Sequence, residues 1–197
     1  MSARESHFTG VGPVGVRIAG CAADILELAA FRGQAAALVA LAVQRGEPLP
    51  ALGLVGKGTA GLNLAVRPDR WLLLAAPAEP GVLARSWQQH CGHCAAAIEL
   101  SGALTAIHIT GDATRELLKR GCRLDLDPAR FPAGRAASTI MVQVPVILAA
   151  LTDGVLLLTP SSTARHFREW LATTAKPFGL GAGANASVAL LSGELLS

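Results

Sequence analysis

The sequence predicts an α+β fold, with mostly antiparallel strands and with helices on one face of the sheets. Strand-like and helix-like apolar runs alternate along the chain, and short turns join neighbouring strand-like runs. In addition, 51% of the 197 residues are hydrophobic, which is enough to bury a sizeable core. Together these three observations favour a compact mixed fold.

Three strand-like runs and two helical runs occupy the first half of the chain. The first predicted helix ends at Arg45-Gly46. Pro80 suits the first position of the second predicted helix, because a backbone N–H at that position makes no hydrogen bond within the helix. Arg67-Pro68-Asp69-Arg70 is typical of a turn between two strands. The predicted strands are Ile25–Phe31, Leu62–Val66 and Trp71–Ala75, and the predicted helices are Gln34–Gln44 and Pro80–His93.

The second half follows the same order with additional strands. Thr110-Gly111-Asp112 precedes a short helix, and Lys119-Arg120 at its end suits the negative pole of the helix dipole. Pro145 and Asp153-Gly154 are predicted to separate the last three strands. The predicted strands are Ala96–Leu100, Leu104–Ile109, Ser138–Val144, Val146–Leu151 and Val155–Leu158. A loop is expected over Cys122–Gly134, and helices over Ala113–Arg120 and from near Ser161.

We predict that residues 1–197 form a single domain. Two sub-parts, about 14–95 and 96–176, would share one core, and they have a similar order of elements without a convincing sequence repeat. Residues 177–197 are rich in Gly, Ala, Ser and Leu, so a flexible tail is expected there.

Charge is scarce. Only 16% of the residues are charged, with 17 Lys+Arg against 14 Asp+Glu, whereas an ordinary domain has about 25%. A chain with this much apolar residue content and this little charge is not expected to be intrinsically disordered. The absence of a Lys/Arg run argues against nucleic-acid binding. Apolar surface without charge is typical of an interface with other proteins.

No membrane span or secretory signal is predicted. Charges or Pro interrupt the most hydrophobic windows, Cys21–Val43 and Val142–Leu158, and Met1–Gly10 has no apolar stretch. The four cysteines do not form the dense framework of a small secreted domain. We therefore expect a cytoplasmic protein with reduced thiols.

Cys91-Gly92-His93-Cys94 matches a thiol–disulfide oxidoreductase motif, which works when the first Cys lies at a helix N-terminus. Here the cysteines end a predicted helix, where the dipole has the wrong sign. Leu83, Trp87, Cys91 and Cys94 recur at helical spacing, so core packing is the favoured interpretation. Zinc binding by His90, Cys91, His93 and Cys94 is disfavoured because four ligands within five residues cannot all close on one ion.

Two glycine motifs and one pair of carboxylates are also interpreted structurally. Gly10–Gly15 contains Pro13, and Gly56–Gly61 leads into a strand, whereas a dinucleotide fingerprint opens a helix. Asp125 and Asp127 could act as an acid–base pair, but a turn in which Asp127 accepts backbone N–H groups ahead of Pro128 is favoured. We therefore assign no catalytic, cofactor-binding or metal-binding residue.

The most specific segments are Gly121-Cys122-Arg123-Leu124-Asp125-Leu126-Asp127-Pro128, Phe131-Pro132-Ala133-Gly134, Ala137-Ser138-Thr139, Pro68-Asp69-Arg70-Trp71-Leu72-Leu73 and the strand–helix run Ala106–Leu118. In this order they resemble the gamma-subunit family of heterotetrameric sarcosine oxidases, over roughly Leu52–Ala175. Four positions depart from the family pattern. Arg123 replaces Pro, Asp127 replaces His, Arg70 replaces Glu and Ser138 replaces Arg, which is consistent with a divergent member serving a related amine oxidase.

The resemblance implies a fold like the folate-binding domain of the glycine-cleavage aminomethyltransferase. It implies a non-catalytic gamma subunit beside alpha, beta and delta subunits, which would carry FAD, FMN, NAD, zinc and the tetrahydrofolate site. The complex would demethylate sarcosine to glycine, with hydrogen peroxide formed and a one-carbon unit passed to tetrahydrofolate. A stand-alone folate-binding or aminomethyltransferase-like protein is the alternative, and a thiol oxidoreductase is a third class.

Overall fold

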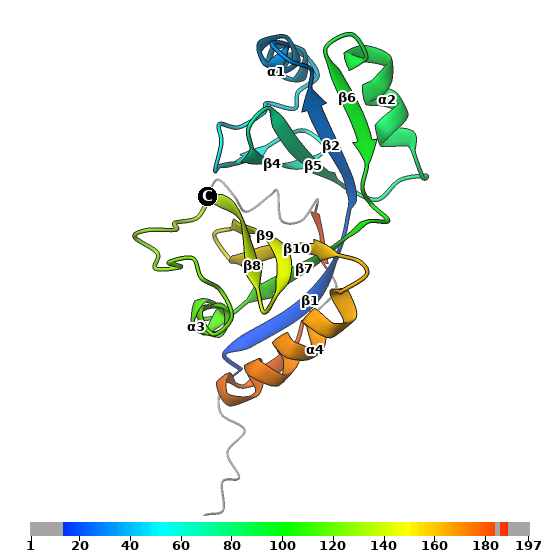
Figure 1. The fold of residues 1–197 in the computed structure, drawn as a ribbon. Coiled ribbons are helices and arrows are strands. Elements are labelled where there is room, and N and C mark those ends of the chain that lie inside the picture. The colour runs from blue at the N-terminus through cyan, green and yellow to red at the C-terminus, as the bar shows by residue number, and fades with distance from the viewer. Residues whose placement is uncertain (1–13, 184–185, 189–197) are drawn as a thin grey trace, which may run out of the picture.

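The computed structural model describes residues 14–183 and 186–188, which form two β-sheets with four helices on their outer faces (Figure 1). The strands are β1 (Val16–Ala22), β2 (Asp24–Ala30), β3 (Val55–Lys57), β4 (Gly61–Arg67), β5 (Arg70–Ala75), β6 (Ala95–Glu99), β7 (Leu104–Thr110), β8 (Ala136–Met141), β9 (Val144–Ala150), β10 (Gly154–Pro160), β11 (Leu180–Ala182) and β12 (Ala186–Ser187). The helices are α1 (Ala35–Gln44), α2 (Val82–Cys91), α3 (Thr114–Lys119) and α4 (Ala164–Ala175), with a 3₁₀ turn at Lys176–Phe178. The predicted α+β class is confirmed.

The first sheet is antiparallel, in the order β3-β4-β5-β2-β6. Alternation along β2 separates its two faces, because Leu26 and Leu28 pack with the helices while Ile25 packs toward the second sheet. On the helical face, Leu38 of α1 and Trp87 of α2 complete a buried cluster. Both helices lie together in the upper part of Figure 1.

The second sheet has the order β11-β1-β7-β10-β9-β8, and β12 also pairs with β1. Its pairs are antiparallel except those of β1 with β11 and β12, which are parallel. Phe167 and Leu171 of α4 and Leu117 of α3 pack on its outer face with Ile107 and Leu157. The helices α1–α4 therefore lie on one face of each sheet.

The inner faces of the two sheets pack against each other. The residues of this inter-sheet core are Cys21, Ile25, Leu62, Leu64, Leu72, Leu74, Ala106, Ala149, Leu151, Leu156, Leu158 and Val188. Long aliphatic side chains on strands of both sheets fill the space between two backbones, which is how face-to-face sheets are stabilised.

The chain crosses between the sheets twice. β1 belongs to the second sheet and β2 to the first, with only Ala23 between them, and β6 of the first sheet leads to β7 of the second. The orders β3-β4-β5-β2 and β8-β9-β10-β7 are the same, so the two sheets share a topology that the sequence does not show as a repeat. The division of the chain into two sub-parts between residues 95 and 96 stays a prediction. Strand β6, which pairs with β2 in the first sheet, includes both of these residues.

One predicted strand boundary is wrong. The β8–β9 turn is at Val142 and Gln143, whose φ values are 48° and 66°, and Pro145 lies inside β9. Positive φ at both central residues is the geometry of a two-residue type I′ hairpin, which Asn-Gly usually signals. Pro145 is tolerated because only Ile147–Ala150 of β9 pair with β10.

The other predicted elements match within a few residues, but the sequence analysis did not predict four of the strands, one of which, β1, is seven residues long. Those are β1, β3, β11 and β12. The expected tail contains β11, which pairs with β1, while residues 184–185 and 189–197 lie outside the described residues. Within 14–183 and 186–188, no helix is both long and apolar enough to cross a bilayer.

Truncating the inter-sheet core tests its contribution to stability. Leu156→Ala removes a fully buried side chain, and we expect it to lower the free energy of unfolding by about 3 kcal/mol, measured by urea denaturation. Leu52→Ala is the matched control because its side chain is 58% exposed, so a change below about 0.5 kcal/mol is expected. Equal effects of the two variants would contradict this packing.

Candidate functional site

Cys91 and Cys94 lie in the core, as the sequence analysis favoured. Both side chains are fully buried in the cluster that includes Trp87, and the Cys91 Sγ lies 3.8 Å from the Ala95 carbonyl oxygen. Burial raises the pKa of both thiols, so the unreactive protonated form prevails near neutral pH. This environment is the opposite of the one that a redox cysteine requires.

The histidines near these cysteines point elsewhere. His90 Nδ1 lies 2.7 Å from the carbonyl oxygen of Ser86, and His93 is exposed while Cys94 is buried. Across the part of the chain that the structure describes, no three His, Cys, Asp or Glu residues are grouped as metal ligands would be.

Asp125 and Asp127 organise a turn. Asp125 Oδ1 accepts a hydrogen bond from the Asp127 backbone N–H at 3.0 Å, and Asp127 Oδ1 accepts one from Ala129 at 2.9 Å. The second bond confirms that Asp127 accepts a backbone N–H group around Pro128. Both carboxylates therefore have local structural partners.

The second glycine motif, Gly56–Gly61, accommodates a carboxylate of the same chain. Glu47 is buried, and its oxygens accept hydrogen bonds from the Ala60 N–H at 2.7 Å and from Asn63 Nδ2 at 3.3 Å. A Cβ at Gly58 would lie 1.6 Å from Glu47 Oε2, so a side chain there would displace the carboxylate. The loop thus binds Glu47 where a phosphate loop would bind its ligand, and it leads into β4 as predicted. Gly10 and Gly12 of the first motif lie outside the described residues.

Arg115 of α3 anchors the loop that carries the most specific motif. Its Nη1 donates hydrogen bonds to the carbonyl oxygens of Leu126 at 2.6 Å and Phe131 at 2.9 Å. The Leu126 and Phe131 side chains are buried in the core of the second sheet. The segment between them is therefore held at both ends while Pro128–Arg130 stay exposed.

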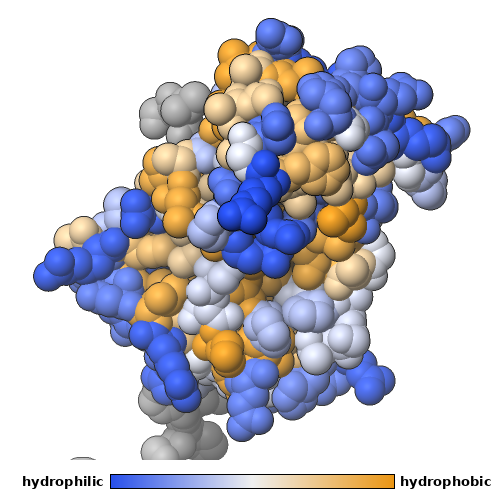
Figure 2. All heavy atoms as spheres, turned by 45° about the horizontal axis from the view of Figure 1, so that its top comes forward, coloured by the Kyte–Doolittle hydropathy of each residue, from blue (hydrophilic) through white to orange (hydrophobic). Residues whose placement is uncertain are grey.

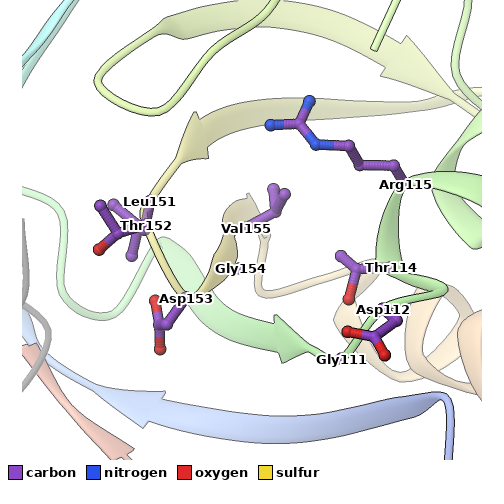
Figure 3. Close-up of a pocket in the computed structure, with 9 residues that line it drawn as sticks. All are labelled: Gly111, Asp112, Thr114, Arg115, Leu151, Thr152, Asp153, Gly154 and Val155. Carbon is purple, nitrogen blue, oxygen red and sulfur yellow. The ribbon is translucent and has the colours of Figure 1, made fainter. Parts of the chain in front are cut away.

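A small pocket of about 240 Å³ lies between the start of α3 and the β9–β10 turn (Figure 3). Asp153 lies on one side of it and Asp112 with Thr114 on the other, and the Arg115 guanidinium extends away from Asp112. Asp153 Oδ2 is 3.4 Å from Nε2 of the buried His108. The nine lining residues are Gly111, Asp112, Thr114, Arg115, Leu151, Thr152, Asp153, Gly154 and Val155, so they contain no Ser, Cys or His for a nucleophile–base pair.

Two arginines share one buried carboxylate on the first sheet. Arg67 and Arg70 both form ion pairs with Glu27, the latter at 2.6 Å. Glu27 is only 5% exposed, and a buried carboxylate requires such partners. The sequence analysis did not single out this cluster, although Glu27 inside the apolar run Ile25–Phe31 was a usable signal.

Several large apolar side chains reach the surface. Figure 2 shows hydrophobic residues in several groups beside strongly hydrophilic ones on one face of the molecule. The most exposed in the described residues are Val14, Phe31, Val43, Leu52, Val82, Ile98, Ile140 and Leu180. Surface of this kind is what the low charge content predicted.

Residues 28–176 match the family model described as "Sarcosine oxidase, gamma subunit family". Sarcosine oxidase subunit gamma of Corynebacterium sp. (strain U-96) is 32% identical over 139 residues, which are 67% of this chain and 65% of that protein. The same subunit of Arthrobacter sp is 29% identical over 116 residues, 59% of this chain and 56% of that protein. The chain thus spans less than two thirds of the length of each relative.

Solved structures are also similar. A chain of heterotetrameric sarcosine oxidase from Corynebacterium sp. U-96 in complex with pyrrole 2-carboxylate matches with a TM-score of 0.74 and 27% identity, over 88% of this chain and 90% of that one. Glycine cleavage system aminomethyltransferase T from Bartonella henselae matches with a TM-score of 0.61 at 11% identity, over 86% and 48%. The second likeness is one of fold and confirms the expected aminomethyltransferase-like arrangement.

Removing the Arg115 side chain tests its role in anchoring the loop. Arg115→Ala loses two charge-assisted hydrogen bonds, so we expect a loss of about 2–4 kcal/mol in unfolding free energy. Amide hydrogen exchange over 122–134 should become faster. Arg130→Ala, in the exposed part of the same loop, is the control, and unchanged exchange in Arg115→Ala would refute the anchoring role.

Alkylation tests the buried thiols. Burial raises the pKa of Cys21 to about 11 and raises those of Cys91 and Cys94, while Cys122 is partly exposed. Iodoacetamide at pH 8 should modify Cys122 first in the folded chain and all four thiols after denaturation, as read by mass spectrometry. Rapid modification of Cys91 in the folded chain would contradict its burial.

The raised pKa of Cys21 also predicts a pH dependence of stability. The free energy of unfolding should fall as pH rises from about 9 to about 11, because the Cys21 thiol ionises near pH 9.0 in the unfolded chain but not in the folded one.

Proposed function

Since the chain belongs to the sarcosine oxidase gamma subunit family, we propose that it is a non-catalytic subunit of a heterotetrameric sarcosine oxidase. The observation that carries this proposal is the match in fold along almost the full length of both chains to a chain of such an enzyme. The structural match covers 88% of this chain and 90% of the other chain, so nearly every part of each chain has a counterpart in the other.

The chemistry-bearing residues of the described chain support a structural role. Cys91 and Cys94 pack in a core, Asp127 caps a turn, and Glu47 fills the glycine-rich loop. These motifs of the described residues therefore have a structural use. A subunit of this kind contributes to an enzyme through its surfaces.

The partners that we propose are the alpha, beta and delta subunits, in the cytoplasm. FAD, FMN, NAD, zinc and the tetrahydrofolate site would belong to those subunits. In the proposed reaction the N-methyl group of sarcosine loses two electrons, which reduce O₂ to hydrogen peroxide. Glycine is released and the oxidised carbon passes to tetrahydrofolate.

A stand-alone folate-binding or aminomethyltransferase-like protein is the second candidate. The fold likeness to aminomethyltransferase T favours it, but at 11% identity that likeness concerns fold alone. The two candidates differ in what the isolated chain can bind.

Co-expression tests the subunit role. When the chain is produced with the proteins encoded beside its gene, we expect one stoichiometric, flavin-containing particle by size-exclusion chromatography. If the chain instead elutes as a stable monomer apart from flavoprotein partners, the subunit role is wrong.

Calorimetric titration of the isolated chain with tetrahydrofolate should give no saturable heat, and saturable binding would favour the second candidate.

A further inference from the structure

A groove opens between the two sheets where the inner face of the second sheet extends beyond the first. We call it the inter-sheet groove, and it has a volume of about 210 Å³. Its lining residues are Arg67, Leu104, Ser138, Thr139, Pro145, Val146, Ile147, Leu158 and Pro160. Six of the nine are apolar, and Arg67 is the one charged residue among them.

Burial along the second sheet shows where the covering ends. Leu158 is buried in the inter-sheet core, and its neighbour across the β9–β10 pair, Ile147, is only partly buried. In the next row, Pro145 is exposed and Ile140, its partner on β8, is 56% exposed. The apolar face of the sheet therefore continues past the point where the first sheet covers it.

The exposed end of this face belongs to a tight, paired β-hairpin. Ile140 and Pro145 flank the two-residue turn at Val142–Gln143, and a proline ring fixes its own φ. A surface that is already ordered loses little conformational entropy on binding. Ile140 can thus act as a preformed apolar contact.

The one charged side chain that lines the groove, Arg67, is accessible to a partner. The Glu27 carboxylate is buried, whereas the side chains of Arg67 and Arg70 that bind it are 53% and 45% exposed. Asp69 lies between the two arginines in the β4–β5 turn and is also exposed, but it is not a lining residue, and the groove lining contains no carboxylate. The exposed guanidinium of Arg67 therefore matches a carboxylate that approaches the groove.

We infer that the inter-sheet groove and the exposed face beside it dock a segment of another subunit of the oxidase. That segment places apolar side chains on Leu104 and Pro145 in the groove and on Ile140 next to Pro145, and a carboxylate on Arg67. The inference rests on the proposed function and adds which surface meets the partner. Apolar contact at the centre supplies the affinity, and the ion pair at the edge supplies orientation and rate of association.

A charge placed at Ile140, on the exposed apolar face beside the groove, tests the apolar contact. In the co-expressed complex, Ile140→Asp should weaken retention of the chain by about tenfold or more, because a carboxylate would be buried against apolar groups. Val43→Asp is the matched control, since Val43 is 59% exposed and lies on α1, on the outer face of the first sheet. Both variants should fold, as unchanged thermal unfolding of the isolated chains would show.

Two arginine variants test the charge. Arg67→Gln and Arg70→Gln each remove one ion pair to Glu27, but only Arg67 lines the groove. Association with the purified remaining subunits should be several-fold weaker and less salt-dependent for Arg67→Gln than for Arg70→Gln. Equal effects of the two would overturn the pairing of Arg67 with a partner carboxylate.

The outcomes separate the two proposals. If wild-type chain fails to join the other subunits, the subunit role fails and the groove assignment fails with it. If wild type and Ile140→Asp assemble equally well, only the groove assignment is wrong, and loss in both Ile140→Asp and Val43→Asp also overturns it. A dimer of the isolated chain that Ile140→Asp abolishes would assign the groove to a second copy instead of another subunit.

Discussion

Burial of apolar side chains between the two sheets is the constraint on which the rest of the structure depends. Leu62, Leu64 and Leu74 of one sheet meet Leu156 and Leu158 of the other, so both inner faces are removed from water. Each outer face then needs a cover of its own, which α1 and α2 supply on one side and α3 and α4 on the other. The chain crosses from one sheet to the other between β1 and β2 and between β6 and β7, so the two sheets are also joined covalently.

Polar side chains inside this framework serve the fold. Glu47 binds the backbone of the glycine-rich loop, Arg115 binds two loop carbonyls, and Glu27 binds two arginines. A buried charge without such partners would be costly, so each of these groups is committed to its local structure. Structural use of these side chains is consistent with membership of a family whose name denotes a subunit.

The low charge content has a physical meaning in this arrangement. Two sheets of unequal extent leave part of one inner face uncovered, and apolar residues such as Ile140 and Pro145 continue there beside the polar Ser138 and Thr139. The hydrophobic composition thus extends from the core to the surface. Under the proposed subunit role, another chain would cover this face, and its apolar surface would lose contact with water on assembly.

The sequence by itself determined the α+β class, α1, the strands β4, β5 and β7, and the core positions of Cys91 and Cys94, because apolar periodicity and turn chemistry are local signals. It also determined the turn at Asp127. Only the tertiary structure decided that β1 joins the second sheet, that Val142–Gln143 turns while Pro145 stays in a strand, and that Glu27 meets Arg67 and Arg70. Those features depend on contacts between residues distant in the chain, where pairing and burial outweigh local preference.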